Sequence, residues 1–568
     1  MKPVRLSATA TIALPRWGLI ALCLLYILPG IVRRDPWKVD DAAGFGIMWT
    51  MAHGALDDWL SPNIVGMPMP NEAPLAYWIG AILIRVFGWL TGDALAARLS
   101  ILVFFAIGTL AVWRTAYVLG RRSESQPLKL AFGGQPAALD YGRTLADGAL
   151  LIYVASLGLL LRSHETASPA LQVSLVATTL YGAACLFDRP SGRAVLGLGV
   201  SAGLLALACG WVTPLLLMTS LLLAAALRYP AVLPKLGIAL VIAFVPMAIW
   251  LLVRQSLGYD TSPINWAAGI ERFGQARPLG GMGKLLKTLI WFTWPAWPIA
   301  LWAVYAWRKQ ITLHIFLPGI TVLIFLAAIP FTNASRDHLL LPLLPPLAIL
   351  ATFGLPTLKR GAINAIDWFS VMTLSAIASF IWLGWIAKQT GWPAPLAKNA
   401  LKQVPSFQPE FNTFALFVAL ITSIGWILLL RWRLGRHPSV LWRAVVLSTG
   451  GIVLCWVLLM TLWLPWLNYR QSYAPVAEQL GAKLPEKYSC VDSDNLGPAQ
   501  RASFAYLGHV KFGRIGDTRC EFLLVQDNGL GRSGRQPQSV APSLKLLWQG
   551  RREADKHELF RLFRRDPR

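Results

Sequence analysis

The sequence predicts an α-helical polytopic membrane protein, and three observations support this prediction. The chain of 568 residues is 55% hydrophobic and only 14% charged, whereas soluble domains carry about 25% charged residues. Its mean hydropathy is +0.52. Apolar runs such as Leu285–Trp307 and Ala444–Leu464 reach the roughly 20 residues that a helix needs to cross a bilayer. The charged faces that a large soluble core would need between these runs are missing from the sequence.

The basic residues cluster in short loops between the apolar runs. The formal net charge is +24, which in a soluble chain would suggest a nucleic-acid partner. Here the pattern is typical of cytoplasmic loops under the positive-inside rule, with attraction to membrane lipid headgroups as a second interpretation. No soluble stretch sets stacking aromatic residues among basic ones, so we expect no nucleic-acid partner.

About thirteen apolar runs are predicted to form transmembrane helices. The first follows a basic N-terminus and has no signal-peptide cleavage site behind it, so we expect an uncleaved helix that enters from the cytoplasm. Segment 74–90 is short and carries Arg85 in its middle, and we expect it to lie along the interface or to dip in partway. The predicted crossings are 17–32, 94–119, 144–161, 169–187, 194–209, 211–227, 236–253, 285–307, 311–330, 338–355, 366–387, 411–431 and 441–466.

The basic loops alternate correctly with the predicted helices from residue 144 onward. This places 33–93, 254–284, 388–410 and 467–568 on the periplasmic side of a bacterial inner membrane. The chain then divides into a transmembrane domain, 1–466, and a periplasmic domain, 467–568. Within the first domain, 33–93 is the first periplasmic loop with juxtamembrane helices, and 254–284 is a second loop on the same side.

Residues 467–568 differ in kind from the rest, because they are polar and mixed. Short runs there follow the alternating pattern of strands. We predict a small α/β domain with helices Tyr473–Leu484 and Pro498–Leu507 and strands Tyr488–Val491, Glu521–Gln526, Leu544–Trp548 and Glu558–Leu562.

Two of the six cysteines, Cys490 and Cys520, lie in this polar region. In an oxidising compartment they can form a disulfide, and two free thiols are the alternative. No pair of cysteines has the spacing of a zinc site. The other four lie in apolar runs, where we expect them to be packing residues: Cys23, Cys185, Cys209 and Cys455.

The first external loop is acidic, against the trend of the whole chain. A pair of carboxylates directly after a membrane helix suits a general base, because partial burial there can tune its pKa. A solvated acidic loop is the alternative interpretation. The carboxylates of the loop are Asp35, Asp40, Asp41, Asp57, Asp58 and Glu72.

Several short motifs follow one another along the chain. They are the pair Asp40–Asp41, then Asp58–Trp59 with Ser61–Pro62, Glu72–Trp78 (EAPLAYW), Ala97–Leu99, Ile270–Phe273, Trp294–Pro298 and His338–Leu350. In this order they resemble the bacterial lipid A aminoarabinose transferases and the wider protein O-mannosyltransferase-like superfamily. Each motif is weak alone, but the resemblance covers most of the chain, including the C-terminal domain.

The resemblance implies a GT-C fold and a glycosyltransferase that takes a sugar from a polyprenyl-phosphate donor. The acceptor would be a lipid A-like molecule, a glycan or a protein hydroxyl at the periplasmic face. Asp40 is the expected base, with Asp41 second. Donor phosphate contacts are expected from Arg272 and less strongly from Arg336 and His338, for which snorkelling at the interface or placement at a helix end is the alternative. Further candidates in the first loop are Glu72, Tyr77 and Asp58.

The sequence also departs from the family. Ala73 stands where relatives have a phosphate-binding Lys, Gly269 aligns with a metal-binding His, and no matching His lies near 467–472. Glu72 alone does not make a metal site, so we expect no metal and no other cofactor. The departures leave a different donor or acceptor, or an inactive relative, as alternatives.

A transporter or lipid flippase is the main alternative class. Transporters often carry internal repeats and ionisable residues at the middle of the membrane, and neither pattern is evident here. A non-enzymatic scaffold has no specific support. The acidic external loop and the soluble tail have no obvious transport role, so the transferase hypothesis is favoured.

Overall fold

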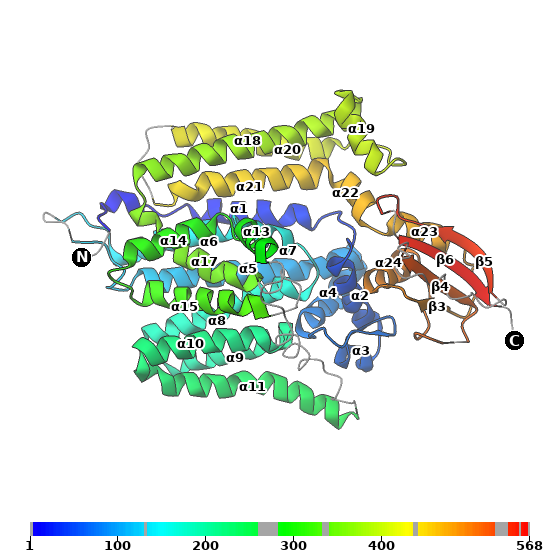
Figure 1. Cartoon of the computed structure of the whole chain (residues 1–568), viewed down its shortest axis with the longest axis horizontal. Helices are drawn as coiled ribbons and strands as arrows, with labels where there is room; N and C mark the ends of the chain where they lie inside the picture. The colour runs from blue at the N-terminus through cyan, green and yellow to red at the C-terminus, as the bar shows by residue number, and fades with distance from the viewer. Residues whose placement is uncertain are drawn as a thin grey trace.

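The computed structural model describes residues 4–129, 133–258, 282–331, 340–434, 441–517, 519–528, 544–555 and 558–565. A long bundle of helices is joined at one end to a smaller domain that contains a β-sheet (Figure 1). The first external loop folds into helices at the junction between the two.

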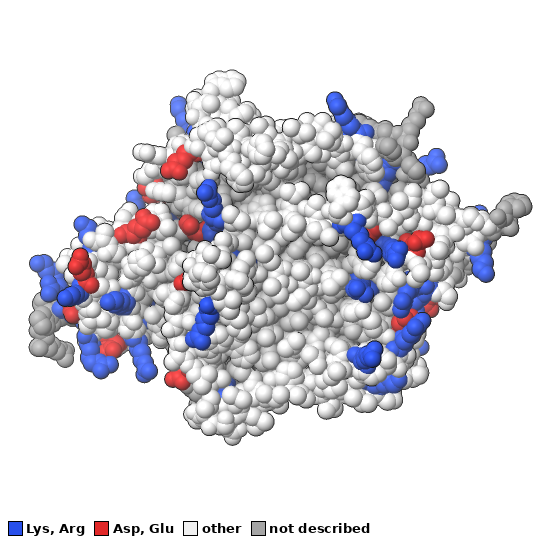
Figure 2. Space-filling model, turned by 180° about the vertical axis from the view of Figure 1, so that it is seen from behind, with Lys and Arg blue, Asp and Glu red and all other residues white. Residues whose placement is uncertain are grey.

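Eight helices in the described part of the chain are long and apolar enough to cross a membrane. These are α5 (Asp93–Gly120), α8 (Ser168–Asp188), α9 (Gly192–Cys209), α11 (Leu233–Ser256), α15 (Leu313–Ala328), α18 (Arg360–Thr390), α20 (Thr413–Leu434) and α21 (Arg443–Leu462). Short 3-10 turns lengthen two of these spans, α11 to Pro230–Ser256 and α15 to Leu313–Phe331. The chain is therefore a multi-pass membrane protein. A broad band of uncharged surface lies between two charged ends of the molecule (Figure 2).

The predicted helix 285–307 is broken into two. α13 (Met282–Phe292) and α14 (Ala296–Trp307) meet at an angle of 86°. Pro295 lies at the break, where it has no N–H to continue the helical hydrogen bonds. If the bent pair counts as one span, the described residues contain up to nine.

The predicted helix 144–161 is also interrupted. α6 (Ala138–Val154) ends before α7 (Leu157–Arg162) begins, and the two breaks touch, because the N–H of Leu157 donates to the Trp294 carbonyl at 3.1 Å. The remaining apolar helices of the bundle are shorter: α1 (Arg16–Ile27), α4 (Leu75–Thr91), α10 (Val212–Arg228) and α17 (Leu344–Thr352). The number of thirteen crossings is therefore not confirmed, because several predicted spans are short or broken.

The first external loop contains α2 (Asp40–His53), α3 (Leu56–Leu60) and a short hairpin of β1 (Asn63–Ile64) and β2 (Met67–Pro68). Apolar residues of α2 pack with residues of α4, among them Phe45, Met48, Tyr77 and Ile84. The opposite side of α2 lies against the C-terminal domain. Gly46 permits this contact, because an added Cβ there would lie 2.4 Å from the Cβ of Ala502.

The C-terminal domain holds a four-stranded sheet with the order β3-β4-β6-β5. Its strands are β3 (Val491–Asp494), β4 (Phe522–Asn528), β5 (Leu544–Gly550) and β6 (Glu558–Arg565), and its helices are α23 (Ala474–Gly481) and α24 (Pro498–Leu507). β3 runs parallel to β4, and the other pairs are antiparallel. Two more helices, α19 (Ala394–Gln403) and α22 (Leu464–Gln471), lie at this end of the molecule (Figure 1).

Three of the four predicted strands overlap observed strands almost completely, but the first was predicted too early. β3 begins at Val491, the last residue of the predicted run. From Val491 onward the backbone pairs with Phe522 to Val525 of β4, whereas the Tyr488 hydroxyl accepts a hydrogen bond from the Lys511 N–H. The small domain is thus α/β, with a small mixed sheet.

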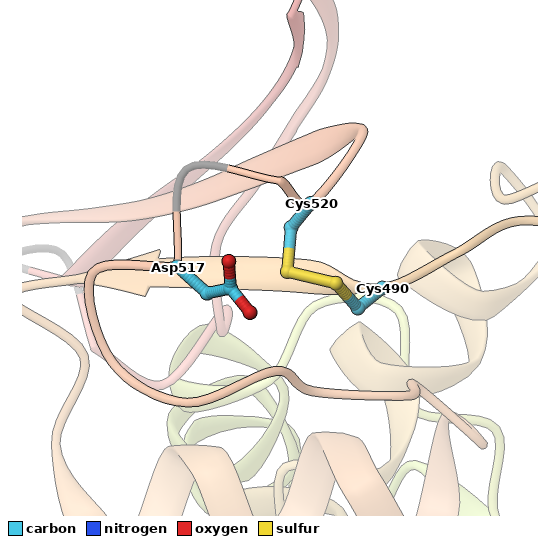
Figure 3. Close-up of side chains that lie close together, drawn as sticks. All are labelled: Cys490, Asp517 and Cys520. Carbon is cyan, nitrogen blue, oxygen red and sulfur yellow. A yellow bond between two sulfur atoms is a disulfide. The ribbon is translucent and has the colours of Figure 1, made fainter.

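Cys490 and Cys520 form a disulfide in this domain. The bond joins the residue before β3 to the turn before β4, and the Asp517 side chain points toward the two sulfur atoms (Figure 3). Among the described residues, these three side chains are the one group of His, Cys, Asp or Glu side chains whose ligand atoms lie close enough to hold a metal. Because both sulfurs are bonded to each other, they offer no thiolate to a metal.

Candidate functional site

Asp40 is the first residue of α2 and lies at the junction between the bundle and the C-terminal domain. Its side chain is 42% exposed, and its Oδ2 accepts a hydrogen bond from Arg162 Nη1 at 2.9 Å. The same nitrogen donates to Glu165 Oε2 at 2.9 Å. Arg162, the last residue of α7, therefore bridges two carboxylates that are far apart in the sequence.

Glu72 and Tyr77 belong to the same site. The Tyr77 hydroxyl donates to Glu72 Oε2 at 2.5 Å, and both Asp40 and the Ser168 hydroxyl interact with Tyr77. We call Asp40, Glu72, Tyr77, Arg162 and Glu165 the carboxylate cluster. It brings together the start of α2, the start of α4 with the residue Glu72 before it, the end of α7, and the loop between α7 and α8.

Asp41 points away from Asp40, into the protein. Its side chain is 1% exposed, and its Oδ2 accepts hydrogen bonds from Arg98 at 2.9 Å and from Arg34 at 3.4 Å. Trp37 N–H donates to the same oxygen at 3.0 Å, and Thr166 N–H donates to Oδ1 at 2.8 Å. Consecutive helical residues point about 100° apart, which separates the neighbouring carboxylates into an exposed and a buried one.

Burial alone would raise the pKa of Asp41. The guanidinium groups of Arg98 and Arg34 and the backbone N–H groups of Thr166 and Trp37 outweigh this effect and lower the pKa below its ordinary value. Asp41 is therefore ionised and has its hydrogen bonds satisfied inside the protein, which leaves it no free position from which to take a proton from an acceptor. The prediction that Asp41 is the second base is not supported by this geometry.

The Asp41 ion-pair network fixes the loops around the cluster. Arg98 also donates to the backbone carbonyls of Arg34 and Asp35, and Arg34 donates to the His164 carbonyl at 3.0 Å. The network therefore joins the segment before α2 to the loop between α7 and α8. Through these contacts it holds Asp40 beside Arg162.

Glu165 is the second unusual carboxylate of the site. Burial raises its pKa to about 7, although the Arg162 guanidinium acts in the opposite direction. Asp41 and Asp40 raise it further, because ionised Glu165 would add to their negative charge. Glu165 therefore changes its charge near neutral pH while it shares Arg162 with Asp40.

His164 lies in the same loop but is part of the protein interior. Its Nε2 is 3.0 Å from the Tyr26 carbonyl oxygen, and its ring lies 4.4 Å from the Trp456 ring. Burial and the charge of Arg34 lower its pKa to about 3. The side chain is therefore neutral at physiological pH and supports the packing of the loop.

Asp58 is not part of the carboxylate cluster. Asp58 caps α3, where its Oδ2 accepts the Ala55 N–H at 2.9 Å, and it lies beyond the far end of α2, about 20 Å along that helix from Asp40. The three predicted phosphate contacts, Arg272, Arg336 and His338, lie outside the described residues.

Arg162 and Glu165 are members of the site that the sequence analysis missed. They lie in a short polar run, RSHET, between two apolar runs. The alternation of basic loops puts this run on the same side as the first external loop. The prediction that this run and the first external loop lie on the same side of the membrane was the signal that could have identified Arg162 and Glu165.

The fold is similar to known structures, although no family model matches the chain and no curated protein sequence is similar to it. ArnT from Cupriavidus metallidurans bound to undecaprenyl phosphate matches with a TM-score of 0.66 at 14% identity, over 96% of this chain and 97% of that one. The apo form of the same protein matches with a TM-score of 0.64 at the same identity and coverage.

An oligosaccharyltransferase from Archaeoglobus fulgidus, solved with zinc and sulfate, matches with a TM-score of only 0.37 at 11% identity, over 89% of this chain and 67% of that one. The two ArnT matches show that this chain has the fold of ArnT over nearly its whole length.

Proposed function

We propose that this protein is a membrane glycosyltransferase that moves a sugar from a polyprenyl-phosphate donor to a hydroxyl acceptor. The observation that carries the proposal is the position of Asp40. It is partly exposed and held by Arg162 at the end of a bundle with the ArnT fold. ArnT has been solved with undecaprenyl phosphate bound, which supports a donor of this chemical class.

In the proposed reaction, the Asp40 carboxylate takes the proton of the acceptor hydroxyl as that oxygen attacks the anomeric carbon of the donor sugar. The bond between this carbon and the phosphate oxygen breaks, and its electron pair leaves with the polyprenyl phosphate. Negative charge then grows on the phosphate, where a fixed guanidinium is stabilising. Among the residues of the carboxylate cluster, Arg162 is the one that carries a positive charge. Arg272, Arg336 and His338 remain predicted contacts of the phosphate.

The proposal places the site at the periplasmic face of a bacterial inner membrane, because the basic loops predict this orientation. The acceptor is a lipid A-like molecule, a glycan or a protein hydroxyl. The alternative of a transporter or flippase is not favoured by the ArnT fold or by a partly exposed carboxylate held by an arginine.

The wild-type protein tests the proposal directly. Membranes containing the protein are incubated with a polyprenyl phosphate carrying a labelled sugar, together with lipid A, glycan and peptide acceptors. We expect the label to leave the donor and to appear on one acceptor class. If the labelled donor instead changes leaflet without losing its sugar, the protein is a flippase and the proposal is wrong.

Transfer is expected to be independent of divalent metal. Glu72, whose counterpart contacts the metal in relatives, is hydrogen-bonded to Tyr77, and the sequence lacks the expected His partners. Treatment with EDTA should leave the rate of label transfer unchanged. A loss that added Mg²⁺, Mn²⁺ or Zn²⁺ restores would show that a metal takes part.

The pH dependence of transfer should report Glu165. Below pH 7 Glu165 is protonated and neutral, so that Asp40 is the carboxylate that forms an ion pair with Arg162. As pH rises through about 7, Glu165 ionises, competes for Arg162 and releases Asp40 to accept a proton. The rate of transfer should therefore rise with pH through this range.

The variant E165Q should lose the inflection near pH 7, since its side chain does not titrate. E486Q serves as the matched control, because Glu486 is exposed in the C-terminal domain, and it should keep the wild-type profile. An unchanged pH profile in E165Q would contradict the assignment.

A further inference from the structure

A groove of about 470 Å³ lies between the start of α1, α5 and α6. It is at the opposite end of the bundle from the carboxylate cluster. α5 connects the two places: Arg98 of this helix contacts Asp41, whereas Arg114 lines the groove, about 24 Å further along the helix axis.

Three arginines line the groove: Arg16, Arg114 and Arg143. All three are exposed, and none forms an ion pair or a hydrogen bond through its side chain with another residue that the structure describes. The end of the molecule away from the C-terminal domain is rich in Lys and Arg (Figure 2). The groove therefore presents several positive charges that the described part of the protein does not neutralise by contact.

Asp147 is the one carboxylate that lines the groove. It is 3% exposed, and both of its oxygens are occupied: Oδ2 accepts the Leu14 N–H and Oδ1 accepts the Trp113 indole N–H, each at 2.9 Å. Its role is to fasten the segment before α1 to α5 and α6. It offsets one positive charge of three, so the groove keeps an excess of positive charge.

The rim of the groove is apolar and faces outward. Ile20 is 60% exposed and Leu110 is 57% exposed. Trp17, which lies three residues before Ile20 on α1, is 76% exposed. In a membrane protein, outward apolar side chains lie against acyl chains, and tryptophans gather at the level of the headgroups. A ligand in this groove therefore contacts guanidinium groups inside the groove and apolar side chains at its rim.

The walls of the groove are fixed before any ligand arrives. The Thr144 hydroxyl donates to the Thr11 carbonyl at 2.9 Å, and with the two Asp147 contacts it ties the N-terminal segment to the bundle. A site that is already shaped loses less conformational freedom when it binds.

We infer that this groove binds the phosphate headgroup of an anionic phospholipid of the surrounding leaflet, with Arg16, Arg114 and Arg143 as its contacts. Basic pockets between membrane helices are suited to such headgroups. The apolar rim favours a lipid over free phosphate, because only a lipid also covers Ile20 and Leu110. This site is independent of the proposed transfer reaction at the other end of the bundle.

Native mass spectrometry of the full chain in detergent tests this inference. Cardiolipin, phosphatidylglycerol and phosphatidylcholine are titrated separately against the wild type and against the triple variant R16Q/R114Q/R143Q. The matched control is R189Q/R193Q/R360Q, which removes three exposed arginines of other basic loops and the same amount of charge. A further arm adds inorganic phosphate to the lipid-bound protein.

We expect the wild type and the control to bind the two anionic lipids at least about tenfold more tightly than phosphatidylcholine. The groove variant should lose this preference, and inorganic phosphate should not displace the lipid. Three results would each overturn the inference. The groove variant could bind the anionic lipids as tightly as the wild type, the groove variant and the control could lose this binding to the same extent, or inorganic phosphate could displace the bound lipid. The single variants R16Q and R143Q keep it testable if the triple variant does not fold, because each should weaken anionic lipid binding several-fold.

Discussion

Replacing Asp40 with Asn is expected to lower the rate of sugar transfer by about 10²- to 10⁴-fold, the usual contribution of a general base. The amide cannot take the proton of the acceptor hydroxyl at neutral pH. Its oxygen can still accept the hydrogen bond from Arg162 that the structure shows at 2.9 Å, so the surroundings should stay in place. The measurement is the initial rate of label transfer from the lipid donor.

The control for this variant is D494N, which removes an exposed carboxylate of β3 in the C-terminal domain. It should transfer at the wild-type rate. The thermal unfolding temperature of D40N should stay close to that of the wild type, because a partly exposed ion pair contributes at most about 1 kcal/mol. A D40N protein that folds and transfers sugar at the wild-type rate would rule out Asp40 as the base.

The neighbouring substitution, Asp41 to Asn, should act on stability instead. It removes the negative charge between two buried guanidinium groups, those of Arg98 and Arg34. Breaking a buried ion pair by removing one partner costs about 3–5 kcal/mol, because the remaining charges are left uncompensated. We expect D41N to unfold at a clearly lower temperature and to accumulate at a lower level in the membrane.

The same ion pair gives stability a defined pH dependence. The pKa of Asp41 is lower in the folded protein than its ordinary value, so the ionised form stabilises the fold. This contribution is present above the unfolded pKa, about 3.9, and is lost as pH falls through the folded pKa. Thermal unfolding in detergent should show this acid-dependent loss in the wild type and not in D41N. Equal stability of D41N and wild type at pH 7 would contradict the role of Asp41.

Much of the architecture was predictable because it depends on local patterns. The runs 94–119 and 169–187 became α5 and α8 with ends shifted by one residue, since a crossing helix needs a long apolar stretch and little else. The strands at 521–526 and 544–548 followed from alternating side chains. The break at Pro295 was not predicted, because the apolar run 285–307 continues on both sides of the proline.

The site was harder to predict, because side-chain direction depends on tertiary packing. The sequence shows Asp40 and Asp41 as equivalent neighbours, and only the fold places one toward Arg162 and the other toward Arg98. Glu165 comes close to Asp40 through the meeting of α2 and α7, which are separated by more than a hundred residues. No spacing rule within one segment contains that information.

The docking of the C-terminal domain has a consequence for how the site is maintained. Arg501 of α24 is fully buried and donates to the carbonyls of Ile64 and Val65 in the external loop. α24 also covers the outer side of α2, the helix that carries Asp40. The C-terminal domain therefore fixes the position of the helix that carries Asp40.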